Sequence, residues 1–211
     1  MRVVSQYFLN ASQTMILTVI VFLFMSIADP VSAAFCSLRD PVLAIQRLYP
    51  GVTRHRSIVR PIDQEIRNQV AARLPFTLHH NEIGKHTLYQ VMDDDHLIGF
   101  VQARSELSDW GMVEIAWAIS PDMRIVGLIF QRCRSSDCNE TLKNKVLVAF
   151  RGRSFTRLLG LMSADGESLS EEGKAFFSPD SAMPLLMLSS ALKTLAVTEL
   201  AWGDVISAQQ K

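Results

Sequence analysis

The chain has 211 residues with 21 basic and 21 acidic side chains, so its formal net charge is zero. Binding along a nucleic acid requires clustered excess cations, and this balance therefore argues against nucleic acid as the main partner. Apolar residues make up 48% of the chain and prolines number only eight, which argues against disorder and favours one domain with a hydrophobic core.

An uncharged apolar run, residues 15–27, follows a short region whose only cationic side chain is Arg2. This layout is typical of a secretory signal, and the run is shorter than the roughly 20 apolar residues that a spanning helix needs. Small residues suited to a signal peptidase place cleavage after Ala33 or one residue later. The sequence therefore predicts export to the periplasm, with residues 1–33 as a signal peptide or membrane anchor and residues 34–211 as a single domain.

Two helices are expected in the first part of that domain. Asp40 and Pro41 form a cap and first-turn pair, and apolar residues at helical spacing follow them until Pro50. A second helix is expected between Pro61 and Pro75, because four apolar residues there share one helical face. These four are Ile62, Ile66, Val70 and Leu74.

The middle of the chain changes to the two-residue period of strands. Two extended runs, residues 87–92 and 96–104, flank the turn Asp93-Asp94-Asp95, as in a hairpin. Residues 111–119 alternate between large apolar side chains and small or polar ones, and a turn then leads into residues 123–131. The pattern predicts an antiparallel meander of about four strands.

Helical spacing returns after the strands, over residues 139–162, and a final long helix is expected from about Pro184. Its apolar face would carry Leu185, Leu188, Leu192 and Leu195. The expected fold class is therefore α+β, in which an antiparallel meander sheet is flanked by N-terminal and C-terminal helices.

The chain has three cysteines, Cys36, Cys133 and Cys138. In an oxidising compartment two of them can pair, most simply Cys133 with Cys138, and the rival pairing is Cys36 with Cys133. A structural disulfide or free thiols are favoured over a redox or metal pair, because no second cysteine pair and no adjacent haem-type histidine are present.

Motifs for a serine nucleophile, a phosphate-binding glycine loop and a dinucleotide fingerprint are absent, which argues against hydrolases and kinases. His79, His80 and His86 lie near Glu82, but their spacing matches no standard metal site, so a solvated loop is expected here.

Two further groups of polar residues are candidates for ligand binding. Glu114 lies mid-strand on a face with small side chains, where a ligand has room to approach; the alternatives are an exposed sheet face or pairing with Arg124. Five arginines could together hold a phosphate, although a solvated face is favoured. They are Arg132, Arg134, Arg151, Arg153 and Arg157.

Several of these elements match one known pattern. It consists of a glycine-containing strand at Ile98-Gly99-Phe100, a strand that begins at Gly111, an acidic turn at Asp122, a Phe-x-Gly element at Phe150-Arg151-Gly152 and a helix with the pair Ser189-Ser190. In these features residues 87–202 resemble the FMN-binding domain of the periplasmic flavin subunits of sodium-pumping NADH:quinone reductases and Rnf complexes.

The resemblance also contains a departure. In that family the threonine of a Ser-Gly-Ala-Thr element carries FMN through a phosphodiester bond, and here Met187 takes that position. Met187 has no hydroxyl group, so covalent attachment is excluded. The resemblance then implies either a non-covalent FMN site or a fold that has lost the flavin. In the FMN site Ser189, Ser190 and Arg132 would hold the phosphate, and Glu114 would lie near the ring or ribityl chain.

The function that the resemblance implies is that of an exported FMN-binding-domain-like protein, accessory to membrane-associated electron transfer, with residues 15–27 as its tether if they are kept. Its partner would be a membrane redox complex, and any activity would be that of a flavin-dependent electron carrier rather than a hydrolase or transferase. One alternative is a cofactor-free accessory or interaction domain with the same fold. Another is a thiol-based redox protein that uses Cys133 and Cys138.

Overall fold

The computed structural model describes residues 39–79, 82–178 and 182–208. The chain divides into two units, Met1–Ser32 and Ala33–Lys211, and the description below concerns the second. The expected signal or anchor at residues 15–27, the cleavage site after Ala33 and Cys36 lie outside the described residues.

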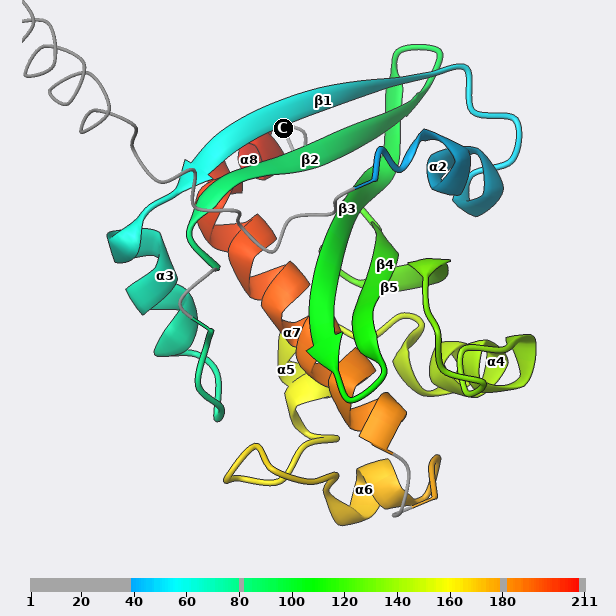
Figure 1. Ribbon diagram of the computed structural model, residues 1–211. Coiled ribbons are helices and arrows are strands. Elements are labelled where there is room, and N and C mark those ends of the chain that lie inside the picture. Colours follow the sequence, from blue (N-terminus) through cyan, green and yellow to red (C-terminus); the bar gives the residue numbers. More distant parts are fainter. Residues whose placement is uncertain (1–38, 80–81, 179–181, 209–211) are drawn as a thin grey trace, which may run out of the picture. The chain divides into compact units, whose positions relative to one another are not determined.

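Five strands form one antiparallel sheet in which each strand pairs with the next along the chain (Figure 1). This arrangement confirms the α+β class and the meander, with one strand more than the four expected. The strands are β1 (Arg54–Ile62), β2 (Gly84–Asp93), β3 (His96–Ser108), β4 (Gly111–Ile119) and β5 (Ile125–Arg132).

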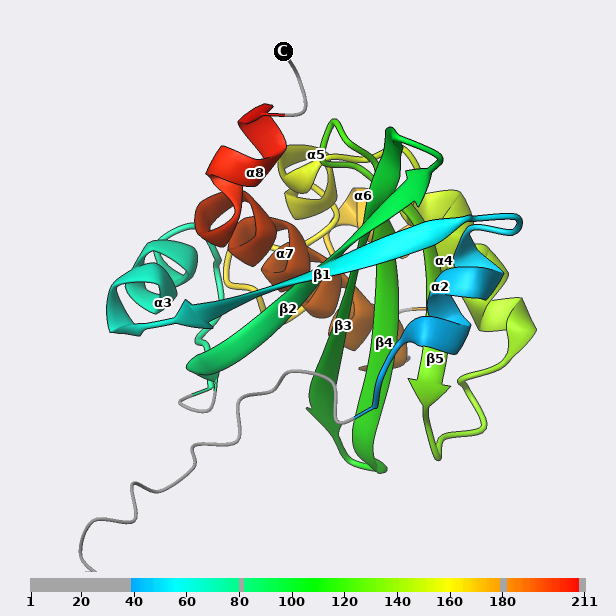
Figure 2. The same ribbon diagram turned by 90° about the horizontal axis from the view of Figure 1, so that it is seen from above.

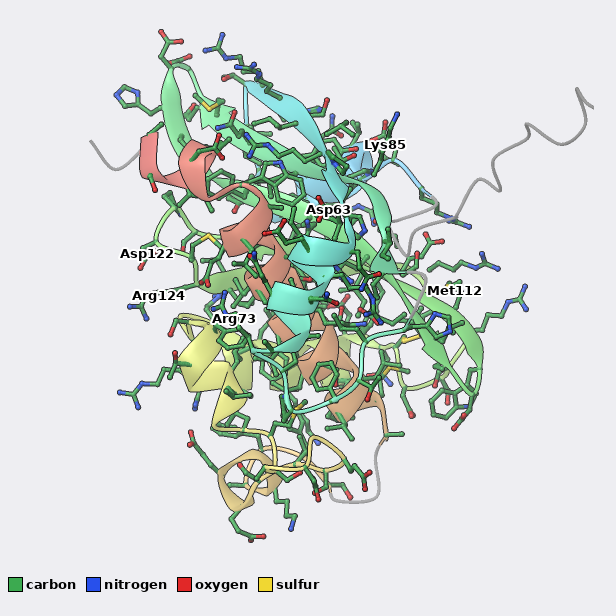
Figure 3. All side chains as sticks on the ribbon, turned by 90° about the vertical axis from the view of Figure 1, so that its left-hand side faces the viewer. Asp63, Arg73, Lys85, Met112, Asp122 and Arg124 are labelled. Atoms are coloured by element: carbon green, nitrogen blue, oxygen red, sulfur yellow. A yellow bond between two sulfur atoms is a disulfide. The ribbon has the colours of Figure 1, made fainter. Side chains whose placement is uncertain are left out.

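The additional strand, β1, occupies a segment for which no element was expected, together with the first two residues of the expected second helix. Pro61 pairs with Lys85 of β2 instead of starting a helix, which is possible because β1 is an edge strand. Helix α3 (Gln64–Ala71) begins later, where the side chain of Asp63 accepts a hydrogen bond of 2.9 Å from the Ile66 N–H (Figure 3). The expected start at Pro61 was therefore wrong by three residues.

The remaining helices surround the sheet. Those expected from the sequence are α2 (Val42–Leu48), α4 (Glu140–Phe150), α5 (Phe155–Leu159) and α7 (Ala182–Ala201). Two short helices, α6 (Glu171–Lys174) and α8 (Gly203–Ala208), were not expected.

The alternation along β4 separates two hydrophobic cores. Ile115 and Trp117 belong to the larger core, which α7 covers, while Ala116 packs with Ile45 of α2 in the smaller one. Figure 2 shows α7 and α2 on opposite sides of the sheet. Both faces of the sheet are therefore buried along β4.

Tyr49, which follows α2, anchors this helix to the sheet. Its hydroxyl donates to the carbonyl of Ile119 over 3.2 Å. The approach depends on Gly99 of β3, because a Cβ atom there would lie 2.2 Å from the Tyr49 hydroxyl oxygen. The close packing of Tyr49 therefore explains why the Ile98-Gly99-Phe100 element has a glycine at its centre.

Helix α7 is the core helix of the domain. Among the described residues it is the one helix long and apolar enough to cross a bilayer by length and composition, with a mean hydropathy of 1.2. Most of its residues are buried against the sheet, α3 and α5. That burial accounts for its apolar composition within the fold.

Candidate functional site

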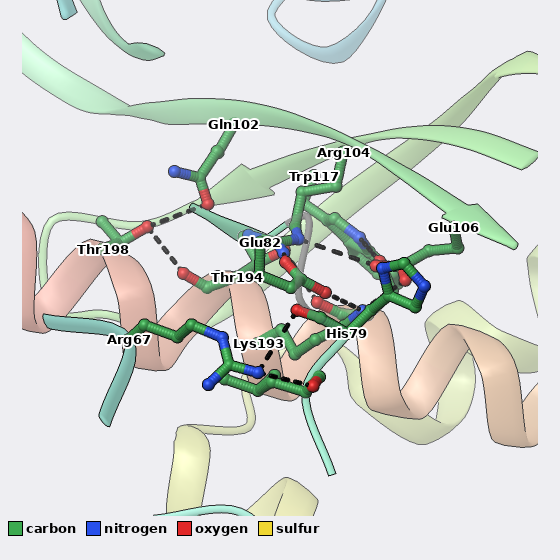
Figure 4. Close-up of polar contacts among 12 residues, drawn as sticks. Arg67, His79, Glu82, Gln102, Arg104, Glu106, Trp117, Lys193, Thr194 and Thr198 are labelled. Carbon is green, nitrogen blue, oxygen red and sulfur yellow. Dashed lines mark hydrogen bonds and ion pairs between the residues drawn. The ribbon is translucent and has the colours of Figure 1, made fainter. Parts of the chain in front are cut away.

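A buried cluster of charged side chains lies where the segment before β2, strand β3 and helix α7 meet (Figure 4). Arg104 of β3, with 0% exposure, forms ion pairs with Glu82 and Glu106. Lys193 of α7 also contacts both carboxylates, with its Nζ 2.9 Å from Oε1 of Glu82. Two cations and two anions therefore neutralise one another inside the domain.

The protonation states in this charged cluster follow from burial and charge. Burial alone would raise the pKa of Glu82, but Arg104 and Lys193 outweigh it and lower that pKa to about 2. Burial and the charge of Arg104 lower the pKa of His86 to about 4. Glu82 is therefore ionised and His86 neutral near pH 7.

The structure overturns the expectation of a solvated loop around these residues. Glu82 and His86 are both buried. The Glu82 carboxylate can be buried because two cations distant in sequence neutralise it. His79 precedes the gap in the described residues, and His80 lies within it. Within the described ranges, no group of three or more His, Cys, Asp or Glu side chains could hold a metal ion.

The charged cluster has little room for a ligand. The cavity that Glu82, Arg104 and Lys193 help to line has a volume of only about 10 Å³, which is about the space of one water molecule. The polar side chains continue along α7, where Thr198 lies near Gln102. This arrangement fixes α7 on the sheet rather than presenting groups to a substrate.

The two serines of the expected FMN site have other partners. Ser190 is fully buried, and its hydroxyl oxygen accepts a hydrogen bond of 3.0 Å from the indole N–H of Trp117. The hydroxyl of Ser189 donates to the carbonyl of Leu185 over 3.0 Å within the same helix. Met187 is also fully buried, so this part of α7 belongs to the core.

Glu114 and Arg132 lie opposite each other on β4 and β5, on the face that also carries Ala116. Glu114 has 0% exposure, and its nearest recorded cation is the Nε of Arg39 at 3.8 Å. This glutamate lies on the opposite face of β4 from Trp117, which contacts Ser190. The structure brings Glu114 and Arg132 together but keeps them apart from Ser190.

The alternative pairing of Glu114 with Arg124 was wrong. Arg124 follows the β4–β5 turn, and its Nε lies 2.5 Å from the carboxylate of Asp122 in that turn (Figure 3). The acidic turn at Asp122 therefore has a local partner.

A disulfide joins Cys133 and Cys138, whose Cα atoms are 6.1 Å apart. It links the end of β5 to the loop before α4. At the end of that loop, the side chain of Asn139 accepts a hydrogen bond of 3.0 Å from the Leu142 N–H. The bridge therefore restrains the entry into α4.

A larger pocket, of about 450 Å³, lies between α2, β5 and α4, and we call it the α2–α4 pocket. Of the five arginines considered for phosphate binding, only Arg151 lines it, and Arg153 instead pairs with Glu172 at 2.6 Å. Arg47, in the last turn of α2, also lines the pocket. Arg47 was not expected at a site, although its place near the end of an expected helix is visible in the sequence.

The Phe150-Arg151-Gly152 element closes α4 and returns the chain to the sheet. Gly152 has a φ of +76°, and its N–H donates to the carbonyl of Ile125 over 2.8 Å. This contact places the element beside the start of β5.

No protein-family model matches the chain, and no curated protein matches it.

Proposed function

We propose that this chain is an exported accessory domain with an FMN-binding-domain-like fold that works beside a membrane redox system without a flavin of its own. Export rests on residues 15–27, and the electron-transfer setting rests on the resemblance of residues 87–202. The observation that carries the cofactor-free role is the hydrogen bond between Trp117 and Ser190. The hydroxyl that a flavin phosphate would need is fully buried, and its oxygen accepts the N–H of a core indole.

The packing around this bond supports the same proposal. A phosphate could reach Ser190 only if Trp117 left the core, where its ring lies 6.2 Å from that of Phe150. The indole N–H would then have to find another partner, since an unsatisfied buried donor costs about 1–3 kcal/mol. Ser189 is bonded within its own helix and Met187 offers no hydroxyl. Core packing therefore replaces cofactor contacts along α7.

Flavin binding is tested on the exported protein, purified from cells that are supplied with riboflavin. The expected result is a colourless protein in which no quenching of the fluorescence of added FMN depends on Ser190 or Arg132. A non-covalent flavin site predicts a visible flavin spectrum that Ser190→Ala or Arg132→Gln weakens. Such a spectrum, lost in these variants, would overturn the cofactor-free role.

The redox setting is tested separately in isolated membranes. Quinone reduction rates are compared between cells with and without the gene, and between cells that carry the wild type and Trp117→Phe. The expected result is a lower rate without the gene at unchanged membrane flavin content. Equal rates would contradict an accessory role in electron transfer.

A further inference from the structure

We infer that the α2–α4 pocket binds a small organic phosphate, a phosphomonoester, in a site distinct from the one that the family resemblance implies. Three cationic side chains line the pocket, Arg47, Lys143 and Arg151, against one carboxylate, Glu140. The whole chain is neutral, so this excess of positive charge is local. None of Ser189, Ser190 and Glu114 lines the pocket.

The two arginines are available to a ligand. Neither Arg47 nor Arg151 forms an ion pair with any carboxylate of the described residues. The Nε of Arg151 donates to the carbonyl of Val126 over 3.0 Å, which fixes the orientation of its guanidinium group. Lys143 already contacts the Glu140 carboxylate at 2.9 Å. The pocket therefore offers two guanidinium groups for one anion.

This charge arrangement suits a phosphate. A phosphomonoester carries between one and two negative charges near neutral pH. Guanidinium groups bind its oxygens through paired N–H donors. The pocket also includes Asn139 and Glu140, at the positive N-terminal end of the 11-residue helix α4. Side chains and helix dipole therefore favour the same ligand charge.

The size and lining indicate that the phosphate carries an organic group. A volume of about 450 Å³ exceeds what an inorganic phosphate fills and lies within the range of small-molecule sites. The apolar side chains of Leu48, Leu128 and Leu147 also line the pocket. A small apolar or aromatic group attached to the phosphate can pack against them.

The disulfide prepares the pocket for binding. Cys138 is one of the lining residues, and its bridge to Cys133 restrains the loop that leads into α4. Because the bridge orders this loop before a ligand binds, the entropic cost of binding is lower. The same bridge fixes the N-terminal end of α4 that faces the phosphate.

Isothermal titration of the purified protein with phenyl phosphate at constant ionic strength tests the inference. We expect saturable binding that Arg47→Gln and Arg151→Gln each weaken by about tenfold or more. Glu140→Gln should strengthen it, because among the described residues Glu140 is the only carboxylate that lines the pocket. Arg157→Gln, on the exposed side of α5 and outside the pocket, is the matched control and should leave affinity unchanged.

Further ligands identify the recognised chemistry. Phenol tests the organic group without charge, inorganic phosphate tests the charge alone, and vesicles of phosphatidylglycerol test a lipid source of phosphate. The inference is overturned by absence of saturable phenyl phosphate binding, by equal affinity in Arg47→Gln and Arg157→Gln, or by binding to vesicles alone. Circular dichroism melts of each variant separate a lost site from a lost fold. FMN is itself a phosphomonoester, so the variants assign any FMN binding: loss in Arg47→Gln assigns it to this pocket, and loss in Ser190→Ala assigns it to the flavin site, which keeps failure of the two proposals distinguishable.

Discussion

The ammonium group of Lys193 lies 2.9 Å from the carboxylate of Glu82, and the two residues are 111 positions apart in the chain. Replacing Lys193 by Met should lower the free energy of unfolding by about 3–5 kcal/mol, because Glu82 and Glu106 would share one remaining cation in a buried site. Urea denaturation measures this change. Lys174→Met, which removes an exposed i,i+3 pair with Glu171, is the control and should cost less than about 0.5 kcal/mol. Equal losses would show that the charged cluster does not stabilise the fold.

Stability should fall as the pH drops below about 6.5, because His86 has a depressed pKa. The unfolded chain binds a proton on this histidine near pH 6.5, whereas the folded chain does so only near pH 4. The unfolding free energy should decrease by on the order of 3 kcal/mol across that window. Glu82 adds a second decrease between about pH 4.5 and 2, as its stabilising charge is lost.

Denaturation curves of His86→Gln and of the exposed control His96→Gln, recorded between pH 7 and 4.5, check this prediction. The His86 variant should show a flatter pH dependence than the wild type, and the His96 variant should follow the wild type. Parallel curves for all three proteins would contradict the assignment to His86.

The two neighbouring serines of α7 should respond differently to truncation. Ser190→Ala removes the acceptor of the Trp117 indole N–H and should cost about 1–3 kcal/mol. Ser189→Ala removes only a bond to its own helix and should change stability by less than about 0.5 kcal/mol. Thermal unfolding followed by tryptophan fluorescence compares them. A larger effect at Ser189 would refute the core role of Ser190.

A methyl group at position 99 should loosen α2 from the sheet. Gly99→Ala would place a Cβ atom 2.2 Å from the Tyr49 hydroxyl oxygen and 2.8 Å from the Ile119 carbonyl oxygen, and should destabilise the domain by about 2 kcal/mol or more. Gly203→Ala is the control, because nothing lies within 4 Å of a Cβ there. Adding Tyr49→Phe to Gly99→Ala should recover part of the loss by removing the hydroxyl. Equal melting temperatures of Gly99→Ala and Gly203→Ala would contradict this prediction.

Much of the fold could be predicted because its strands and helices have regular apolar patterns. The alternation along β4 assigned its two faces correctly, but the face with Glu114 and Ala116, expected to be exposed or open to a ligand, is buried against α2. Strand β1 was missed because it is an edge strand with mostly exposed residues, so neither face carries an apolar pattern. The period of a strand is visible in a sequence only where its two faces have different surroundings and therefore carry different kinds of side chain.

The charged cluster could not be predicted from local patterns. Glu82 lies 22 positions from Arg104 and 111 from Lys193, and no periodicity connects residues so far apart. The usable signal was a charge inside an otherwise apolar element, as with Arg104 in β3 and Lys193 in α7. For Ser190 the local pattern was misleading. Its hydroxyl matched a ligand-binding motif, but in the structure it accepts a hydrogen bond from a core tryptophan.

The composition of α7 bears on whether this helix can enter a membrane before the domain has folded. By length and hydropathy it could enter a bilayer, yet Lys193 lies near its centre. A lysine at that depth raises the free energy of membrane insertion by about 2.5–3.5 kcal/mol. In the folded domain the same ammonium group is paired with two carboxylates. One side chain thus disfavours the lipid and favours the folded domain, which directs a membrane-like helix into the core of the domain.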